Sequence, residues 1–147
     1  MPMYFAYGSN MDAGAMRKLC PRSTPLGPAR LMHHRFAILQ AGYATVEPDP
    51  LASVHGLLFD VDQIDFPALD RYEGLSDGLY VRLLKSVFRD NGPVAAAFVY
   101  LGCGASGGQA LPGYMECVAG LARVANFPRE YVVELERFVP SKAAPAV

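Results

Sequence analysis

The sequence feature that most constrains the fold is a β-hairpin in the second half of the chain. Two runs rich in β-branched and aromatic residues, 80–88 and 94–101, are separated by Arg-Asp-Asn-Gly-Pro at 89–93. An Asn-Gly pair between two such runs is a strong hairpin signal, because both residues readily adopt the positive φ angles of a tight turn. The sequence therefore predicts two antiparallel strands, around which the rest of the chain has to fold.

Further strands and helices are predicted on both sides of this hairpin. Apolar, aromatic and β-branched runs predict strands at 3–7, 29–39 and 53–61. Apolar residues at helical spacing predict helices that begin after the N-cap candidates Asp12 and Asp62, and two more over 112–124 and 128–138. Antiparallel strand pairs with inserted and appended helices predict an α+β fold, whose sheet is a small mixed or antiparallel β-barrel.

Length and charge restrict the classes of protein to be considered. A chain of 147 residues fits a single domain over 1–147, in which the Ala- and Pro-rich residues 141–147 are expected to fray. Thirteen Lys and Arg against fourteen Asp and Glu leave no basic surplus for nucleic acid or anionic membranes. With no long apolar run and no secretion signal, we expect a cytoplasmic protein that binds neither nucleic acid nor membrane.

Sequence motifs for metals and nucleotide cofactors are missing. The three cysteines form no CxxC pair, and neither a GxxxxGK[ST] loop nor an HExxH helix occurs. His33 and His34 are neighbours on a predicted strand, so their side chains point to opposite faces and cannot share a metal ion. We therefore expect no metal and no cofactor.

The tripeptide Gly8-Ser9-Asn10 is a candidate anion site. It follows a predicted buried strand, and successive backbone N–H groups at such a place can point into one concavity that binds a carboxylate, a phosphate or an oxyanion. Taken alone, the tripeptide fits an ordinary turn better, since Gly, Ser and Asn are also common turn residues.

Glu73 is a candidate general base, and two tyrosines are candidates for the same site. Glu73 lies at the predicted end of an apolar helix, just before Gly74, which is placed as a helix-ending glycine. Partial burial there would raise the pKa of Glu73 toward the range of a general base. The more common reading of such a glutamate is a solvated surface residue. Tyr80 and Tyr100 lie on the two hairpin strands, where their hydroxyls can face one pocket or their rings can simply pack.

Several blocks of the sequence carry a resemblance to a known family. These blocks are YFAYGSNM at 4–11, LDRYEG at 69–74, GLYV at 78–81, AFVYL at 97–101, PGY at 112–114 and FPREY at 127–131. Their order and spacing resemble the γ-glutamylcyclotransferase-like superfamily, which includes the γ-glutamylamine cyclotransferases and the plant AIG2-like proteins. The resemblance covers nearly the whole chain. It implies a small barrel with surrounding helices and a cavity between the loop at 7–10 and Glu73.

The resemblance also implies an activity and a set of site residues. The family reaction converts a γ-glutamyl amino acid or γ-glutamyl amine to 5-oxoproline and releases the amino acid or amine, without a metal. Carried over by residue, Glu73 is the catalytic general base, and the substrate-binding residues are Tyr7, Gly8, Ser9, Asn10, Tyr80 and Tyr100. Two alternatives remain open: removal of a γ-glutamyl protecting group from a biosynthetic intermediate, and a non-catalytic module that binds a small carboxylate.

The glycine-rich segment 102–109 bears on the leaving group. It contains no charged residue, whereas a leaving group with its own carboxylate is normally bound by Arg or Lys. If this segment covers the substrate, small neutral or amine leaving groups are expected to react at least as well as α-amino acids.

Overall fold

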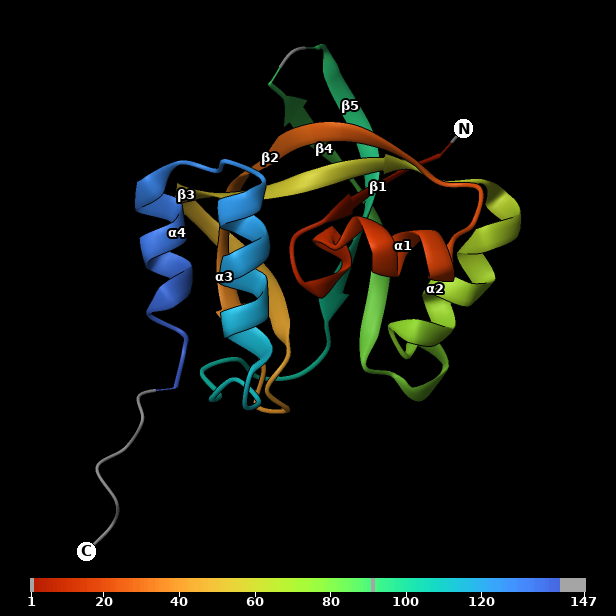
Figure 1. Cartoon of the computed structure of the whole chain (residues 1–147). Coiled ribbons are helices and arrows are strands. Elements are labelled where there is room, and N and C mark those ends of the chain that lie inside the picture. The colour runs from red at the N-terminus through yellow and green to blue at the C-terminus, as the bar shows by residue number, and fades with distance from the viewer. Residues whose placement is uncertain (1, 91, 141–147) are drawn as a thin grey trace, which may run out of the picture.

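The computed structural model describes residues 2–90 and 92–140 as a closed β-barrel surrounded by helices (Figure 1). The strands are β1 (Met3–Ala6), β2 (Thr24–Ile38), β3 (Ala44–Asp60), β4 (Tyr80–Arg89) and β5 (Val94–Gly102). Their order around the barrel is β1-β3-β2-β4-β5. Because β1 pairs parallel with β5 and the other neighbours pair antiparallel, the sheet is mixed, and the predicted α+β barrel is confirmed.

The predicted hairpin forms strands β4 and β5. Their antiparallel register runs from Tyr80 opposite Gly102 to Phe88 opposite Val94. The turn residue Asn91 lies outside the described residues, as does the segment 141–147 that we expected to fray. The hairpin therefore contributes two adjacent strands of the barrel, and Tyr80 and Tyr100 lie toward its open end.

Four α-helices occur in the described residues: α1 (Ala13–Leu19), α2 (Phe66–Tyr72), α3 (Tyr114–Val124) and α4 (Arg129–Glu136). Asp12 caps α1 as predicted, since its Oδ1 accepts from the N–H groups of Gly14 and Ala15. Helices α3 and α4 pack side by side, and Figure 1 places them at the opposite end of the molecule from α2. Within the described ranges, no helix is long and apolar enough to cross a membrane.

Strand β3 begins nine residues before the strand that we predicted from residue 53. The additional residues include Pro48 and Pro50, and proline has no N–H to donate to a sheet. The structure pairs the segment with β2, with Pro48 opposite His34 next to a register shift between Met32 and His34. An irregular ladder of this kind tolerates prolines that a regular central strand excludes.

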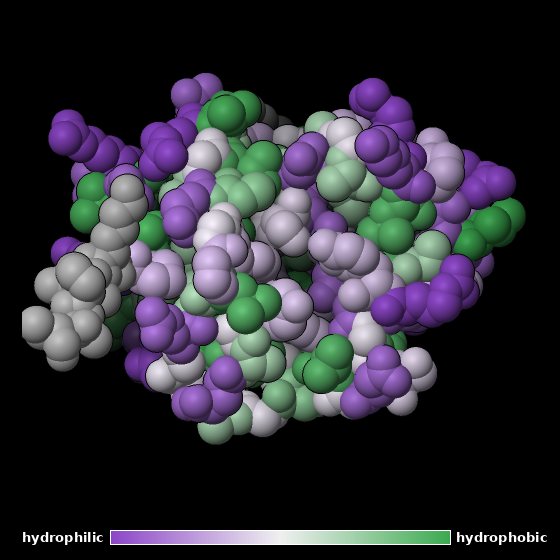
Figure 2. All heavy atoms as spheres, turned by 60° about the horizontal axis from the view of Figure 1, so that its bottom comes forward, coloured by the Kyte–Doolittle hydropathy of each residue, from purple (hydrophilic) through white to green (hydrophobic). Residues whose placement is uncertain are grey.

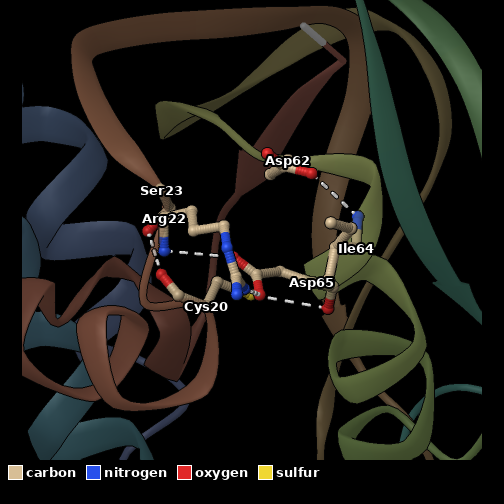
Figure 3. A network of polar contacts seen from close by, with 6 residues as sticks. All are labelled: Cys20, Arg22, Ser23, Asp62, Ile64 and Asp65. Carbon is tan, nitrogen blue, oxygen red and sulfur yellow. Dashed lines mark hydrogen bonds and ion pairs between the residues drawn. The ribbon is translucent and has the colours of Figure 1, made fainter.

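A polar cluster fixes the start of helix α2 (Figure 3). Asp62 caps the 3-10 turn η2 (Gln63–Asp65) that leads into the helix, through a bond from the Ile64 N–H to its Oδ1. Asp65 is 4% exposed and accepts two bonds from Arg22, one from its backbone N–H at 3.0 Å and one from Nη1 at 2.8 Å. The segment after α1 is thereby tied to the residue from which α2 begins.

Candidate active site

A cavity of about 400 Å³ opens where several chain segments meet at one end of the barrel. Its walls come from the loop after β1, the end of α2, the first residue of β4, the end of β5 and the start of α3. Figure 2 shows this side of the molecule, where the surface is hollowed near the centre. Segments far apart in sequence thus contribute to one enclosed space.

All seven candidate residues from the sequence line this cavity. They are Tyr7, Gly8, Ser9, Asn10, Glu73, Tyr80 and Tyr100. The remaining lining residues, which we had not assigned to the site, are Tyr4, Tyr43, Ala44, Tyr72, Leu79 and Tyr114. Seven of the eight tyrosines in the chain therefore line a single cavity. Four of the missed residues lie inside the family-like blocks, which was the available signal for them: Tyr4, Tyr72, Leu79 and Tyr114.

The loop after β1 lines the cavity with Gly8, Ser9 and Asn10. Gly8 leads into the 3-10 turn η1 (Ser9–Met11), in which the Met11 N–H bonds the Gly8 carbonyl at 3.1 Å. The first N–H groups of such a turn, those of Ser9 and Asn10, have no partner within it. A Cβ at position 8 would lie 3.1 Å from the Tyr114 hydroxyl, so glycine leaves room for that group.

Glu73 is held at the C-terminal end of α2. Its N–H bonds the Leu69 carbonyl at 3.0 Å, and Gly74 follows with a left-handed φ of 69°, as predicted for a helix-ending glycine. The carboxyl group is half-buried, and Asn10 Nδ2 donates to its Oε1 at 3.2 Å. The same Nδ2 lies 3.1 Å from the Tyr4 hydroxyl. Asn10 therefore joins the loop to the carboxyl group on α2.

The electrostatic surroundings of Glu73 favour a protonated carboxyl group. Burial raises its pKa from 4.5 to about 7. No Arg or Lys side chain lines the cavity among the described residues, so nothing positively charged offsets the desolvation of the carboxylate. At neutral pH the group is close to half ionised, and it is able both to accept and to return a proton.

The tyrosine hydroxyls differ from what we expected of Tyr80 and Tyr100. The Tyr80 hydroxyl donates to the Ala44 carbonyl, and the Tyr100 hydroxyl donates to Asp70 Oδ1 at 2.6 Å. The Tyr7 hydroxyl likewise donates to the Tyr100 carbonyl at 2.5 Å. These three residues line the cavity, but their hydroxyl protons are already donated to other groups of the protein.

The Tyr114 hydroxyl, by contrast, can donate its proton to a bound molecule. Its oxygen accepts from the Ala44 N–H at 3.3 Å, and no bond from this hydroxyl to another group occurs in the described residues. Burial raises its pKa to about 12, so the proton stays on the oxygen at neutral pH. Next to Gly8, Tyr114 is therefore a side-chain donor that we had not predicted.

The glycine-rich segment after β5 does not line the cavity, so the condition on which we based its effect on the leaving group is not met. The Ser106 carbonyl accepts from Gln40 Nε2 at 2.9 Å, and the Ser106 hydroxyl donates to Glu47 Oε2 at 2.8 Å. The segment is thus bound to the β2–β3 side of the barrel, and none of residues 102–109 lines the cavity. The half-exposed side chains of Tyr43, Tyr72 and Leu79 lie there instead.

The described residues contain no cluster of three His, Cys, Asp or Glu side chains suited to a metal ion. The chemistry that the cavity itself supports is acid–base catalysis. A carboxyl group with a pKa near 7 lines a cavity of small-molecule size together with the loop at 8–10. The fold is thus that of a small barrel protein, with a cavity that contains a carboxyl group suited to acid–base chemistry.

Comparison with known proteins defines the family. The profile of the family described as "Gamma-glutamyl cyclotransferase, AIG2-like" matches residues 4–114, and the chain belongs to this family. Human gamma-glutamylcyclotransferase is 24% identical over 149 aligned positions, which cover 95% of this chain and 79% of that protein. The mouse protein of the same name is 25% identical over 150 positions, with 95% and 80% coverage. The resemblance inferred from the sequence blocks is confirmed.

A solved structure described as "Gamma-glutamyl cyclotransferase" has the same fold. It superposes with a TM-score of 0.86, is 24% identical, and the match covers 99% of this chain and 92% of that one. The barrel with its surrounding helices is therefore the fold of this family.

Proposed function

We propose that this protein is a cyclotransferase that converts a γ-glutamyl amino acid or γ-glutamyl amine to 5-oxoproline and the free amino acid or amine. The observation that carries the proposal is the half-buried carboxyl group of Glu73, whose pKa of about 7 suits a general base at neutral pH. Family membership supports the reaction class.

Glu73 would handle protons at both nitrogens of the substrate. Its carboxylate takes a proton from the substrate ammonium group, and the freed amine attacks the γ-carbonyl carbon. The Glu73 acid then protonates the leaving nitrogen as its bond to that carbon breaks. The ring nitrogen loses its further proton to solvent, and the released amine takes one up. Since nucleophile and carbonyl belong to one molecule, the protein has mainly to hold a near-attack conformation.

The loop at 7–10 would bind the anionic parts of the substrate. Ser9, Asn10 and Tyr114 line the cavity, and the N–H groups of the first two and the hydroxyl of the third would be its donors. Such donors stabilise a carboxylate or the oxyanion of the tetrahedral intermediate without a positively charged side chain. Tyr7, Tyr80 and Tyr100 would position the glutamyl chain with their rings.

The leaving group would meet an uncharged rim. Tyr43, Tyr72 and Leu79 are the exposed lining residues, and no Arg or Lys is among the described ones. A leaving group without a carboxylate then loses nothing relative to an α-amino acid. We expect γ-glutamyl alkylamines to react at least as well as γ-glutamyl-alanine.

The test is to incubate the purified protein with γ-glutamyl-alanine and a γ-glutamyl alkylamine of similar size, and to measure 5-oxoproline by mass spectrometry. The same compounds with an acetylated α-amine are the control, because they lack the nucleophile. Release of 5-oxoproline from the free amines alone supports the proposal. A preference of more than about 100-fold in kcat/KM for the alanine compound, roughly 3 kcal/mol, would contradict the uncharged rim.

Two other outcomes favour the alternatives. Binding of 5-oxoproline or glutamate in calorimetry, without turnover of any γ-glutamyl compound, indicates a carboxylate-binding module. Turnover confined to large γ-glutamylated intermediates indicates removal of a protecting group.

A further inference from the structure

A charged pair, Asp70 and Arg82, contacts Tyr100, one of the tyrosines that line the cavity. The Tyr100 hydroxyl donates to Asp70 Oδ1 at 2.6 Å, and Arg82 Nη1 lies 3.2 Å from the same oxygen. The side chains of Asp70 and Arg82 are only 25% and 27% exposed. Asp70 belongs to α2, and Arg82 lies on β4 directly opposite Tyr100 on β5. A single carboxylate oxygen therefore joins three elements of the fold.

Two aromatic rings hold the arginine of this pair in place. The Arg82 guanidinium carbon lies 4.7 Å from the centre of the Phe66 ring and 4.8 Å from that of Phe98. Phe66 is the first residue of α2, and Phe98 lies on β5. A guanidinium stacked on aromatic rings keeps its donors in a fixed plane. Arg82 therefore presents its N–H groups to Asp70 from a defined position.

Tyr100 connects this pair to both halves of the cavity. Its backbone carbonyl accepts the Tyr7 hydroxyl at 2.5 Å, and Tyr7 begins the loop with the backbone donors. Its side chain binds Asp70, three residues before Glu73 and less than one helical turn away. A continuous series of contacts thus leads from the loop through Tyr100 and Asp70 to the segment that carries Glu73.

We propose that Asp70 and Arg82 are positioning residues, which set the separation between Glu73 and the loop at 8–10. This inference rests on the proposed function, because it assigns Glu73 the role of the base. Helix α2 has seven residues, too few to be stable alone, so its orientation depends on tertiary contacts. A displacement of about 1 Å at a reacting group costs roughly 100-fold in rate.

The test compares Asp70→Ala with Asp70→Asn and Arg82→Met. Asp70→Ala is expected to lower kcat about 30- to 100-fold, with KM within about threefold, because substrate contacts remain while Glu73 moves. Asp70→Asn is expected to regain at least about tenfold of that loss, since its amide oxygen still accepts the Tyr100 hydroxyl.

A second measurement reports on Glu73 directly. The Glu73 carboxyl carbon is followed by ¹³C NMR against pH and assigned by its absence in Glu73→Gln. In Asp70→Ala and Arg82→Met its pKa is expected to fall toward the ordinary range, because a helix end released from the barrel brings the carboxylate to water. A purely structural role for Asp70 lowers stability and leaves this titration unchanged.

Glu47→Gln is the matched control. Glu47 also accepts from an arginine, Arg35, and from a hydroxyl, that of Ser106, but it does not line the cavity. Its neutralisation is expected to change neither kcat nor the Glu73 titration. An Asp70→Ala protein with kcat within about threefold of wild type and an unchanged titration overturns the proposal, and so does an equal loss of kcat in Glu47→Gln.

Two further outcomes are decisive in the same way. If Asp70→Ala does not fold, Arg82→Met decides, and an unchanged Glu73 titration in that variant overturns the proposal. If the wild type turns over no γ-glutamyl compound, the proposed function fails. The positioning of Glu73 is then still tested by the titration, independently of turnover.

Discussion

The two ends of helix α2 each carry a carboxylate that the fold treats differently. At the start, Asp65 is almost completely buried and accepts bonds from the Arg22 guanidinium and backbone (Figure 3). At the end, half-buried Glu73 has only the neutral amide of Asn10 as a side-chain partner within the described residues. Two acidic groups eight positions apart thus have opposite electrostatic surroundings.

The difference shows what separates a structural carboxylate from a reactive one. The Asp65 carboxylate accepts charge-assisted hydrogen bonds from Arg22, and these bonds hold two chain segments together. A carboxylate with burial and no cation has its pKa raised, as Glu73 does to about 7. Partner chemistry, rather than burial alone, therefore decides the use of each group.

The largest effect is expected for Glu73→Gln, which tests whether Glu73 is the reactive carboxyl group. An amide has nearly the size of the carboxyl group and cannot accept a proton, so kcat/KM for 5-oxoproline formation is expected to fall about 10²- to 10⁴-fold, roughly 3 to 5 kcal/mol. The melting temperature at pH 7 is expected to stay at or above that of wild type. Turnover above one-tenth of wild type on every accepted substrate would show that Glu73 is not the base.

Asp65→Ala probes the other end of the helix. It removes a nearly fully buried carboxylate that accepts two hydrogen bonds from Arg22, and we expect a loss of about 2 to 3 kcal/mol in the free energy of unfolding. Urea denaturation measures this loss, and ¹³C NMR is expected to show the Glu73 pKa still near 7. A large fall of the Glu73 pKa in this variant would mean that the two ends of α2 do not act separately.

The pH dependence of stability sharpens the comparison further. The folded pKa of Glu73, about 7, lies above the usual 4.5, so its stabilising contribution is complete below pH 4.5 and is lost as pH rises through 7. Allowing for partial contact with solvent, wild type is expected to lose about 2 kcal/mol relative to Glu73→Gln between pH 4.5 and 8. Parallel stability curves for the two proteins would contradict the raised pKa.

The smallest effect is expected at an exposed pair. Arg35 and Ser106 donate to Glu47 and lower its pKa, so its contribution is present at neutral pH and is lost as pH falls through that lowered pKa. Because the Glu47 side chain is 28% exposed, against 5% for that of Asp65, Glu47→Gln is expected to cost less than about 1 kcal/mol at pH 7 in urea denaturation. A loss of unfolding free energy as large as that in Asp65→Ala would contradict the weaker contribution that we assign to the more exposed carboxylate.

The amino-acid sequence was sufficient to predict most local elements and the residues able to take part in a reaction. Asn-Gly between two apolar runs predicted the β4–β5 hairpin, and Asp12 and Gly74 marked helix ends, because these signals depend on near neighbours along the chain. The family-like blocks singled out the loop at 7–10 and Glu73, and the structure brings them to one cavity.

Tertiary structure alone decided how these groups are partnered. Three features depend on contacts between segments far apart in the sequence. The Pro-containing part of β3 pairs with β2, and residues 102–109 are bound to Gln40 and Glu47. The hydroxyls of Tyr80 and Tyr100 donate to Ala44 and Asp70. Arg22 lies 43 positions from Asp65, whereas no Arg or Lys among the described residues reaches the cavity beside Glu73. Burial and charge act through space over a few ångströms, so the pKa of a carboxyl group is set by folded neighbours that its sequence neighbours do not reveal.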